Sequence, residues 1–134
     1  MNQRLACSIL AFSLAAGLNA VMDELQFHYD RSVFASMKTH QHWLDPRVSW
    51  RNKWRGGDPR QGEAFPLSST SLVAVTDAWH CAKSLWLACI FAAILAPFTR
   101  LVRWRWWVWA LVYFGITILY GGIFELCFAR LLAR

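Results

Sequence analysis

The chain has 134 residues, which suits a single domain, and its 57% of hydrophobic residues and mean hydropathy of +0.29 exclude an ordinary soluble composition. The net charge of +6 comes from basic residues that flank apolar stretches, so we expect them to meet anionic lipid headgroups and expect no nucleic acid partner. The four cysteines lie in or beside apolar stretches, which argues against a disulfide framework and against a cysteine-based zinc site.

The first apolar run covers residues 5–22 and follows Arg4. A helix needs about 20 residues to cross the hydrocarbon core of a bilayer, so this run is long enough. A cleavable signal peptide is the rival interpretation. A cut after Ala20 would place Leu18 three residues before the site, where a small residue is needed. We therefore predict a first transmembrane helix over residues 5–22.

A polar loop follows at residues 23–67 and is too long to be a bare connector, so we expect it to be partly helical. Its start should extend the first helix beyond the membrane. Asp45 and Pro46 form a helix start, because Asp caps the first turn and Pro suits it. A helix over residues 46–54 would end at the Gly56-Gly57 pair. We expect a docking surface of aromatic and basic side chains here, made of Trp43, Arg47, Trp50, Arg51 and Trp54.

The second apolar stretch, residues 72–99, predicts the central transmembrane helix. The serine- and threonine-rich residues 68–71 supply candidate caps, so we expect this helix to begin before the membrane. Small side chains let two membrane helices approach closely. We expect such packing from a stripe made of Ala88, Ala92 and Ala96.

A third transmembrane helix is predicted over residues 107–128, beside an aromatic belt of tryptophans. The short turn before it carries Arg100, Arg103 and Arg105, and short basic loops stay in the cytoplasm. This predicts a multi-pass protein of the bacterial inner membrane. The N-terminus would be cytoplasmic and the loop 23–67 periplasmic, with the whole chain forming one membrane domain.

This topology gathers polar residues at one membrane face. Asp77 and His80 are three residues apart and share a helical face. Two histidines with several carboxylates suit iron, manganese or zinc, and carboxylate-x-x-His pairs on neighbouring helices build di-metal sites. A transition-metal site is therefore one hypothesis, with ligands Glu24, His28, Asp77, His80 and Glu125. The structural alternative is an ion pair between Lys83 and Glu125, with His80 bonded to a backbone carbonyl.

Two segments carry a resemblance. Residues 45–53, DPRVSWRNK, and residues 76–80, TDAWH, resemble uncharacterised small integral membrane proteins of bacteria and their phages. The resemblance implies an integral membrane protein and brings no activity with it.

The first functional hypothesis is therefore an accessory or scaffold subunit of a larger membrane complex, rather than an enzyme. Its partners would be the lipid bilayer and either another membrane protein or further copies of the chain. The alternative is a membrane-embedded metal-dependent or redox enzyme with its site at the outer face. The aromatic content of 16% would also suit packing against a pigment or a quinone.

Overall fold

The computed structural model describes residues 3–99 and 105–125, with side chains as far as residue 123. The described residues form helices and turns, and their one isolated β-bridge joins Trp54 to Glu63.

Three long helices dominate: α1 (Gln3–Phe27), α4 (Ala78–Phe98) and α5 (Trp106–Glu125). Each is long and apolar enough to cross a membrane. This confirms the predicted all-α architecture with three candidate spans. As expected, α1 continues past residue 22, and it ends at Phe27. The predicted end of the third helix, residues 126–128, lies outside the described residues.

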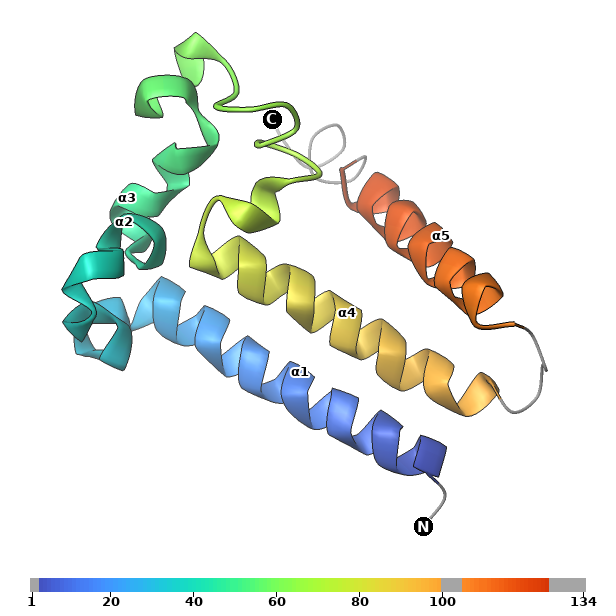
Figure 1. Ribbon diagram of the computed structural model, residues 1–134. Helices are drawn as coiled ribbons and strands as arrows, with labels where there is room; N and C mark the ends of the chain where they lie inside the picture. The colour runs from blue at the N-terminus through green and yellow to red at the C-terminus, as the bar shows by residue number, and fades with distance from the viewer. Residues whose placement is uncertain (1–2, 100–104, 126–134) are drawn as a thin grey trace.

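Helices α1 and α4 lie side by side and run in opposite directions (Figure 1). Their contact buries Ala15, Met22 and Leu25 of α1 and Ala78, Ala82 and Ala93 of α4. Small side chains bring the two backbones so close that the Ser8 hydroxyl donates to the Ala93 carbonyl. The predicted stripe is not the face of α4 that packs against α1. Ala92 is exposed, and Ala88 and Ala96 are only partly buried.

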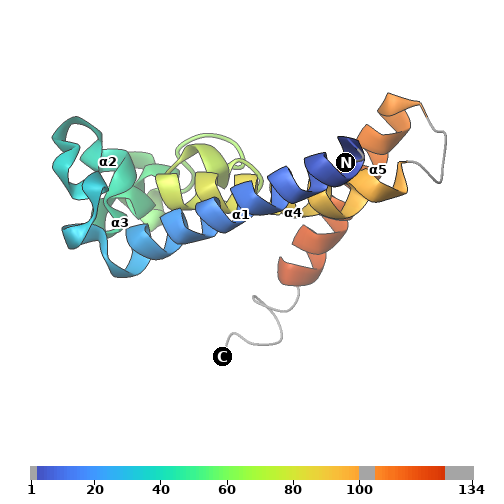
Figure 2. The same cartoon turned by 90° about the horizontal axis from the view of Figure 1, so that it is seen from below.

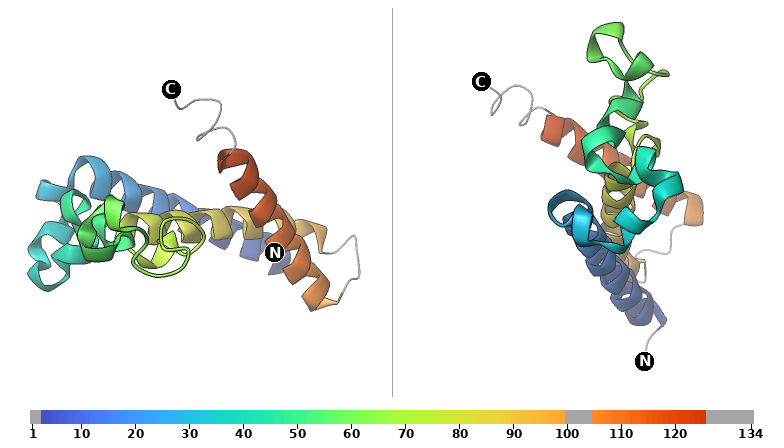
Figure 3. Two further views of the ribbon diagram at one scale, coloured as in Figure 1. Left: turned by 90° about the horizontal axis from the view of Figure 1, so that it is seen from above. Right: turned by 90° about the vertical axis from the view of Figure 1, so that its left-hand side faces the viewer.

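Helix α5 follows α4 but is inclined to it, as Figures 2 and 3 show. On α4, the Phe91 ring meets Tyr113 and Tyr120 of α5 edge-on, with 6.2 and 5.9 Å between the ring centroids. None of the residues in the apolar stretch of α5 is buried. In the described part of the chain, α1 and α4 therefore form a packed hairpin, and α5 rests loosely beside it.

Residues 28–77, the connecting module, join α1 to α4 through short helical turns at one end of the hairpin (Figure 1). Its α-helical turns are α2 (Gln41–Leu44) and α3 (Pro46–Ser49), and its 3-10 turns are η1 (Tyr29–Arg31), η2 (Val33–Ser36), η3 (Lys38–His40), η4 (Trp50–Lys53), η5 (Arg55–Gly57), η6 (Pro59–Gln61) and η7 (Val73–Val75). A small apolar core of Leu25, Tyr29, Leu44 and Ala78 attaches the module to the hairpin.

The predicted start at Asp45 is confirmed, because its carboxylate accepts the backbone N–H of Arg47 at 2.9 Å and Pro46 begins α3. The predicted helix over 46–54 was wrong in length. The α-helical part ends at Ser49, a 3-10 turn follows, and Trp54 is extended. The helix therefore ends before the glycines that were predicted to break it. Gly56 and Gly57 lie in η5 with φ of 58° and 78°, which side chains disfavour.

The start of the second long helix also differs from the prediction. Residues 66–76 form turns, and α4 begins at Ala78 with Asp77 as its cap. Ser68 is fully buried, and its hydroxyl donates to the Lys53 carbonyl at 2.7 Å. The serine-rich segment therefore holds the module together instead of capping α4.

Candidate functional site

Asp77 is a buried carboxylate at the first turn of α4, with only 3% of the residue exposed. Its Oδ1 accepts the backbone N–H of His80 at 2.9 Å, and its Oδ2 accepts the hydroxyl of Thr76 at 3.1 Å. Burial raises the pKa of Asp77, but the hydrogen bonds from His80 and Thr76 together lower it below its ordinary value. The carboxylate is therefore ionised at neutral pH.

The imidazole of His80 is oriented by this carboxylate. Its Nδ1 lies 2.8 Å from both Asp77 oxygens, and the side chain is 27% exposed. An ionised carboxylate accepts hydrogen bonds and donates none, so Nδ1 carries the proton. A neutral His80 then presents the lone pair of Nε2, which has no hydrogen-bond partner among the described residues. The Asp77–His80 pair can therefore accept a hydrogen bond or a proton at Nε2 of His80.

A hollow of about 280 Å³ opens beside this pair. Its walls combine the end of α1, the α3 turn and the start of α4, and its lining residues are Gln26, Pro46, Ser49, Trp50, Asp77, Trp79 and His80. Trp79 also meets the His80 ring edge-on, with centroids 5.0 Å apart. We call this space the Asp77–His80 hollow. It is a mostly apolar pocket with one oriented imidazole.

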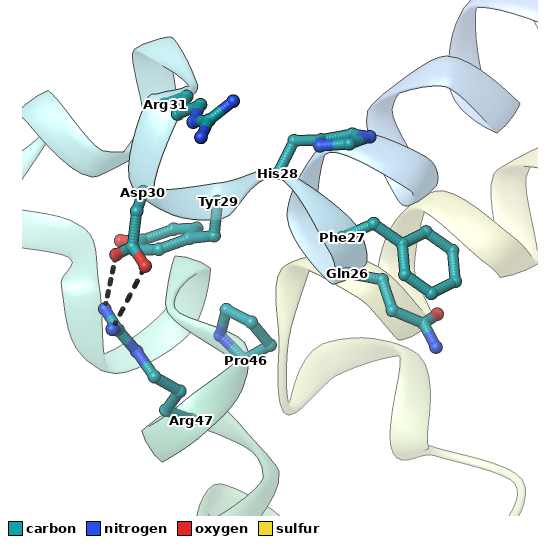
Figure 4. A pocket seen from close by; sticks show the side chains of 8 residues that line it. All are labelled: Gln26, Phe27, His28, Tyr29, Asp30, Arg31, Pro46 and Arg47. Atoms are coloured by element: carbon teal, nitrogen blue, oxygen red, sulfur yellow. Dashed lines mark hydrogen bonds and ion pairs between the residues drawn. The ribbon is translucent and has the colours of Figure 1, made fainter.

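A second hollow, of about 390 Å³, lies next to the first and shares Gln26 and Pro46 with it. In Figure 4 the Asp30 carboxylate meets the Arg47 guanidinium, and the His28 imidazole points away from this pair. Arg47 also binds Asp45 at 2.8 Å. The side-chain hydrogen bond from Arg47 is the main cause that lowers the pKa of Asp45. Two carboxylates already balance the charge of the Arg47 guanidinium. The second hollow is therefore a poor binding site for an anion.

Asn52 ties the module to the base of α4. Its Nδ2 donates to the carbonyl of His42 at 2.7 Å and to the carbonyl of Thr76 at 2.8 Å. The second bond spans 24 residues and fixes the residue that precedes Asp77. The position of the Asp77–His80 pair therefore depends on the fold of the whole module.

The predicted metal ligands are not brought together as a set. Asp77 and His80 are in contact at 2.8 Å, but they do not share a helical face as predicted, because Asp77 is the cap that precedes α4. Among the described residues no group of three or more His, Cys, Asp or Glu side chains converges, so Glu24 and His28 do not join the pair. The Glu125 side chain lies outside the described residues. Glu24 and His28 are both exposed at the end of α1, whereas Asp77 is buried at the start of α4.

Of the predicted ion pair between Lys83 and Glu125, the Glu125 side chain lies outside the described residues. The Lys83 Nζ lies 4.9 Å from the centroid of the Trp79 ring. Of the predicted docking surface, Arg47, Trp50 and Arg51 are exposed. Trp43 instead packs against the core of the module, and Trp54 is half-buried.

Gln26, Ser49 and Asn52 were missed as parts of the site. Single polar residues in a loop carry no spacing signal, and their roles arise from contacts between distant segments. Comparison with protein-family models, curated proteins and solved structures found no match for this chain.

Proposed function

We propose that this chain is a small multi-pass protein of the bacterial inner membrane that serves as an accessory or scaffold subunit of a larger membrane complex. The connecting module would be its docking element. Three long apolar helices support the membrane placement, because the apolar surface they leave uncovered needs lipid or other helices around it.

The observation that carries the docking role is a pre-ordered pair on the module, Trp50 and Arg51. Trp50 is 40% exposed, and its Nε1 donates to the Arg47 carbonyl at 3.1 Å. The Arg51 guanidinium stacks 5.4 Å from the centroid of the Trp50 ring. Tryptophan and arginine dominate the binding energy of protein interfaces, and a side chain fixed in advance loses less entropy on binding.

Charge indicates the kind of partner. Arg47 is matched by Asp30 and Asp45 within the chain. Arg51 stacks on the Trp50 ring and pairs with no carboxylate within the described residues. The exposed pair therefore fits a membrane protein that presents an apolar patch next to a carboxylate.

Site-specific photo-crosslinking tests this role. A photoreactive phenylalanine analogue replaces Val48 in the tagged full chain, an exposed residue three positions before Arg51, so that both docking side chains stay in place. The control places the same analogue at Arg60, another exposed residue of the module. We expect one adduct of defined mass from position 48 in native membranes, and its loss in a Trp50→Ala background. Equal adducts from both positions, or none, would refute docking through this pair.

The orientation has its own test. A periplasm-active reporter placed within residues 55–60 should be active, and the same reporter placed after Arg103 should be silent. The reverse pattern would put the module in the cytoplasm.

A further inference from the structure

We propose that the Asp77–His80 hollow binds the hydroxyl-bearing ring of a membrane-dissolved quinol, with the O–H donating to Nε2 of His80. This goes beyond the docking role, and the two surfaces share one residue, Trp50, which lines the hollow and also belongs to the docking pair. It rests on the proposed membrane placement of α1 and α4.

The first argument is the orientation of the imidazole. Capping of α4 needs only the backbone bond from His80 to Asp77. The side-chain contact at 2.8 Å is additional, and in the neutral imidazole it leaves the Nε2 lone pair as the acceptor. The complementary ligand atom is a hydroxyl donor. Asp77 acts as a positioning residue, because it reaches the ligand only through His80.

The second argument is the shape and composition of the walls. The indole rings of Trp50 and Trp79 and the ring of Pro46 line the hollow, and flat apolar surfaces suit an aromatic ring. Sites for drug-sized ligands usually measure about 300–1,000 Å³. At about 280 Å³, this hollow has room for a single substituted ring.

The third argument excludes other headgroups. No arginine or lysine lines the hollow, and the ionised Asp77 disfavours a phosphate. Lys83 does not line the hollow, but its Nζ lies 4.9 Å from the centroid of the Trp79 ring, and this charge disfavours a second cation at that ring. A metal ion would find one imidazole and no further converging ligands among the described residues. Of the headgroup classes compared, a neutral aromatic alcohol fits the hollow best.

The fourth argument is location. Gln26 lies at the end of α1 and His80 in the first turn of α4, so the hollow sits where two candidate spans end. Tryptophans concentrate at this level of a bilayer. A quinol could place its ring in the hollow while its isoprenoid tail stays in the hydrocarbon region.

The test is equilibrium dialysis with the full chain in phosphatidylcholine nanodiscs, with empty nanodiscs as the partition blank. The probes are durohydroquinone, a tailless quinol kept under anaerobic conditions, and its dimethyl ether, which has the same ring and no O–H. One hydrogen bond contributes about 0.5–1.5 kcal/mol, so the unmodified chain should bind the quinol about two- to tenfold more tightly than the ether.

Variants assign that preference to His80. His80→Phe should bind both probes equally, and Asp77→Asn, which retains a capping side chain, should reduce the preference. His40→Ala, an exposed histidine outside the hollow, should behave like the unmodified chain. Equal binding of quinol and ether by the unmodified chain, absence of saturable binding, or an unchanged preference in His80→Phe would each overturn the proposal. None of these results depends on the crosslinks from position 48, so the two proposals fail separately.

Discussion

Asn52→Ala should open the connecting module, because this one amide holds two segments that are distant in sequence. The substitution removes the bonds to the His42 and Thr76 carbonyls. Each bond contributes about 0.5–1.5 kcal/mol, so the free energy of opening should fall by about 1–3 kcal/mol. The upper end is expected, because Thr76 is 3% exposed and water cannot readily replace the lost donor at its carbonyl.

Hydrogen exchange measured by mass spectrometry checks this, since it reports local opening peptide by peptide. Exchange should accelerate in residues 41–54 and 73–80 and stay unchanged in the middle of α1. Asn52→Asp should be worse than Asn52→Ala, because it sets a carboxylate against two carbonyls. The matched control is Asn19→Ala, whose exposed amide makes one long contact of 3.4 Å. If Asn52→Ala exchanges no faster than Asn19→Ala, the amide does not hold the module.

Three further outcomes are expected. Tyr29→Phe should leave the thermal stability in detergent unchanged or raise it, because the Tyr29 hydroxyl is buried without a hydrogen-bond partner in the described structure; a clear loss would reveal a partner. The hydrogen bond from Arg47 is the main cause that lowers the pKa of Asp45 in the fold. The ionised Asp45 therefore stabilises the fold above the ordinary aspartate pKa of about 3.9, and this stabilisation is lost as pH falls through the lowered pKa. Acid titration monitored by near-ultraviolet circular dichroism should therefore show a transition below about pH 4 that flattens in Asp45→Asn. Lys83→Met and Glu125→Gln should each lower the melting temperature if the two side chains pair, and the double variant should recover part of the loss, whereas additive losses would separate them.

The long helices could be predicted from the sequence because span length and hydropathy are properties of contiguous residues. The contact between Asp77 and His80 was predicted from a shared helical face, but its physical cause is different. Asp77 is the extended cap of α4, and its side chain turns back over the first turn, where it meets His80. The start of α4 was misplaced because a serine-rich run and a single Asp give equally good cap signals, and only the burial of Ser68 shows which one caps.

The Asp77–His80 hollow could not be predicted from the sequence. Its lining joins Gln26, the α3 turn and the start of α4, which become neighbours only once the module has folded. The packed face of α4 was misjudged for a related reason. Several alanine stripes are available on that helix, and which of them meets α1 is decided by the module that sets the rotation of α4.

The bond from Ser8 to the Ala93 carbonyl has a consequence for biosynthesis. Its two residues are 85 positions apart. At a synthesis rate of about 5–20 residues per second, Ala93 follows Ser8 out of the ribosome by about 4–17 s. During that interval the α1 face around Ala15 has no α4 to pack against and is covered by lipid or by the insertion machinery. The hairpin closes only after the whole connecting module has been made, so ribosome-stalled chains shorter than about 90 residues should hold α1 without its native helix partner.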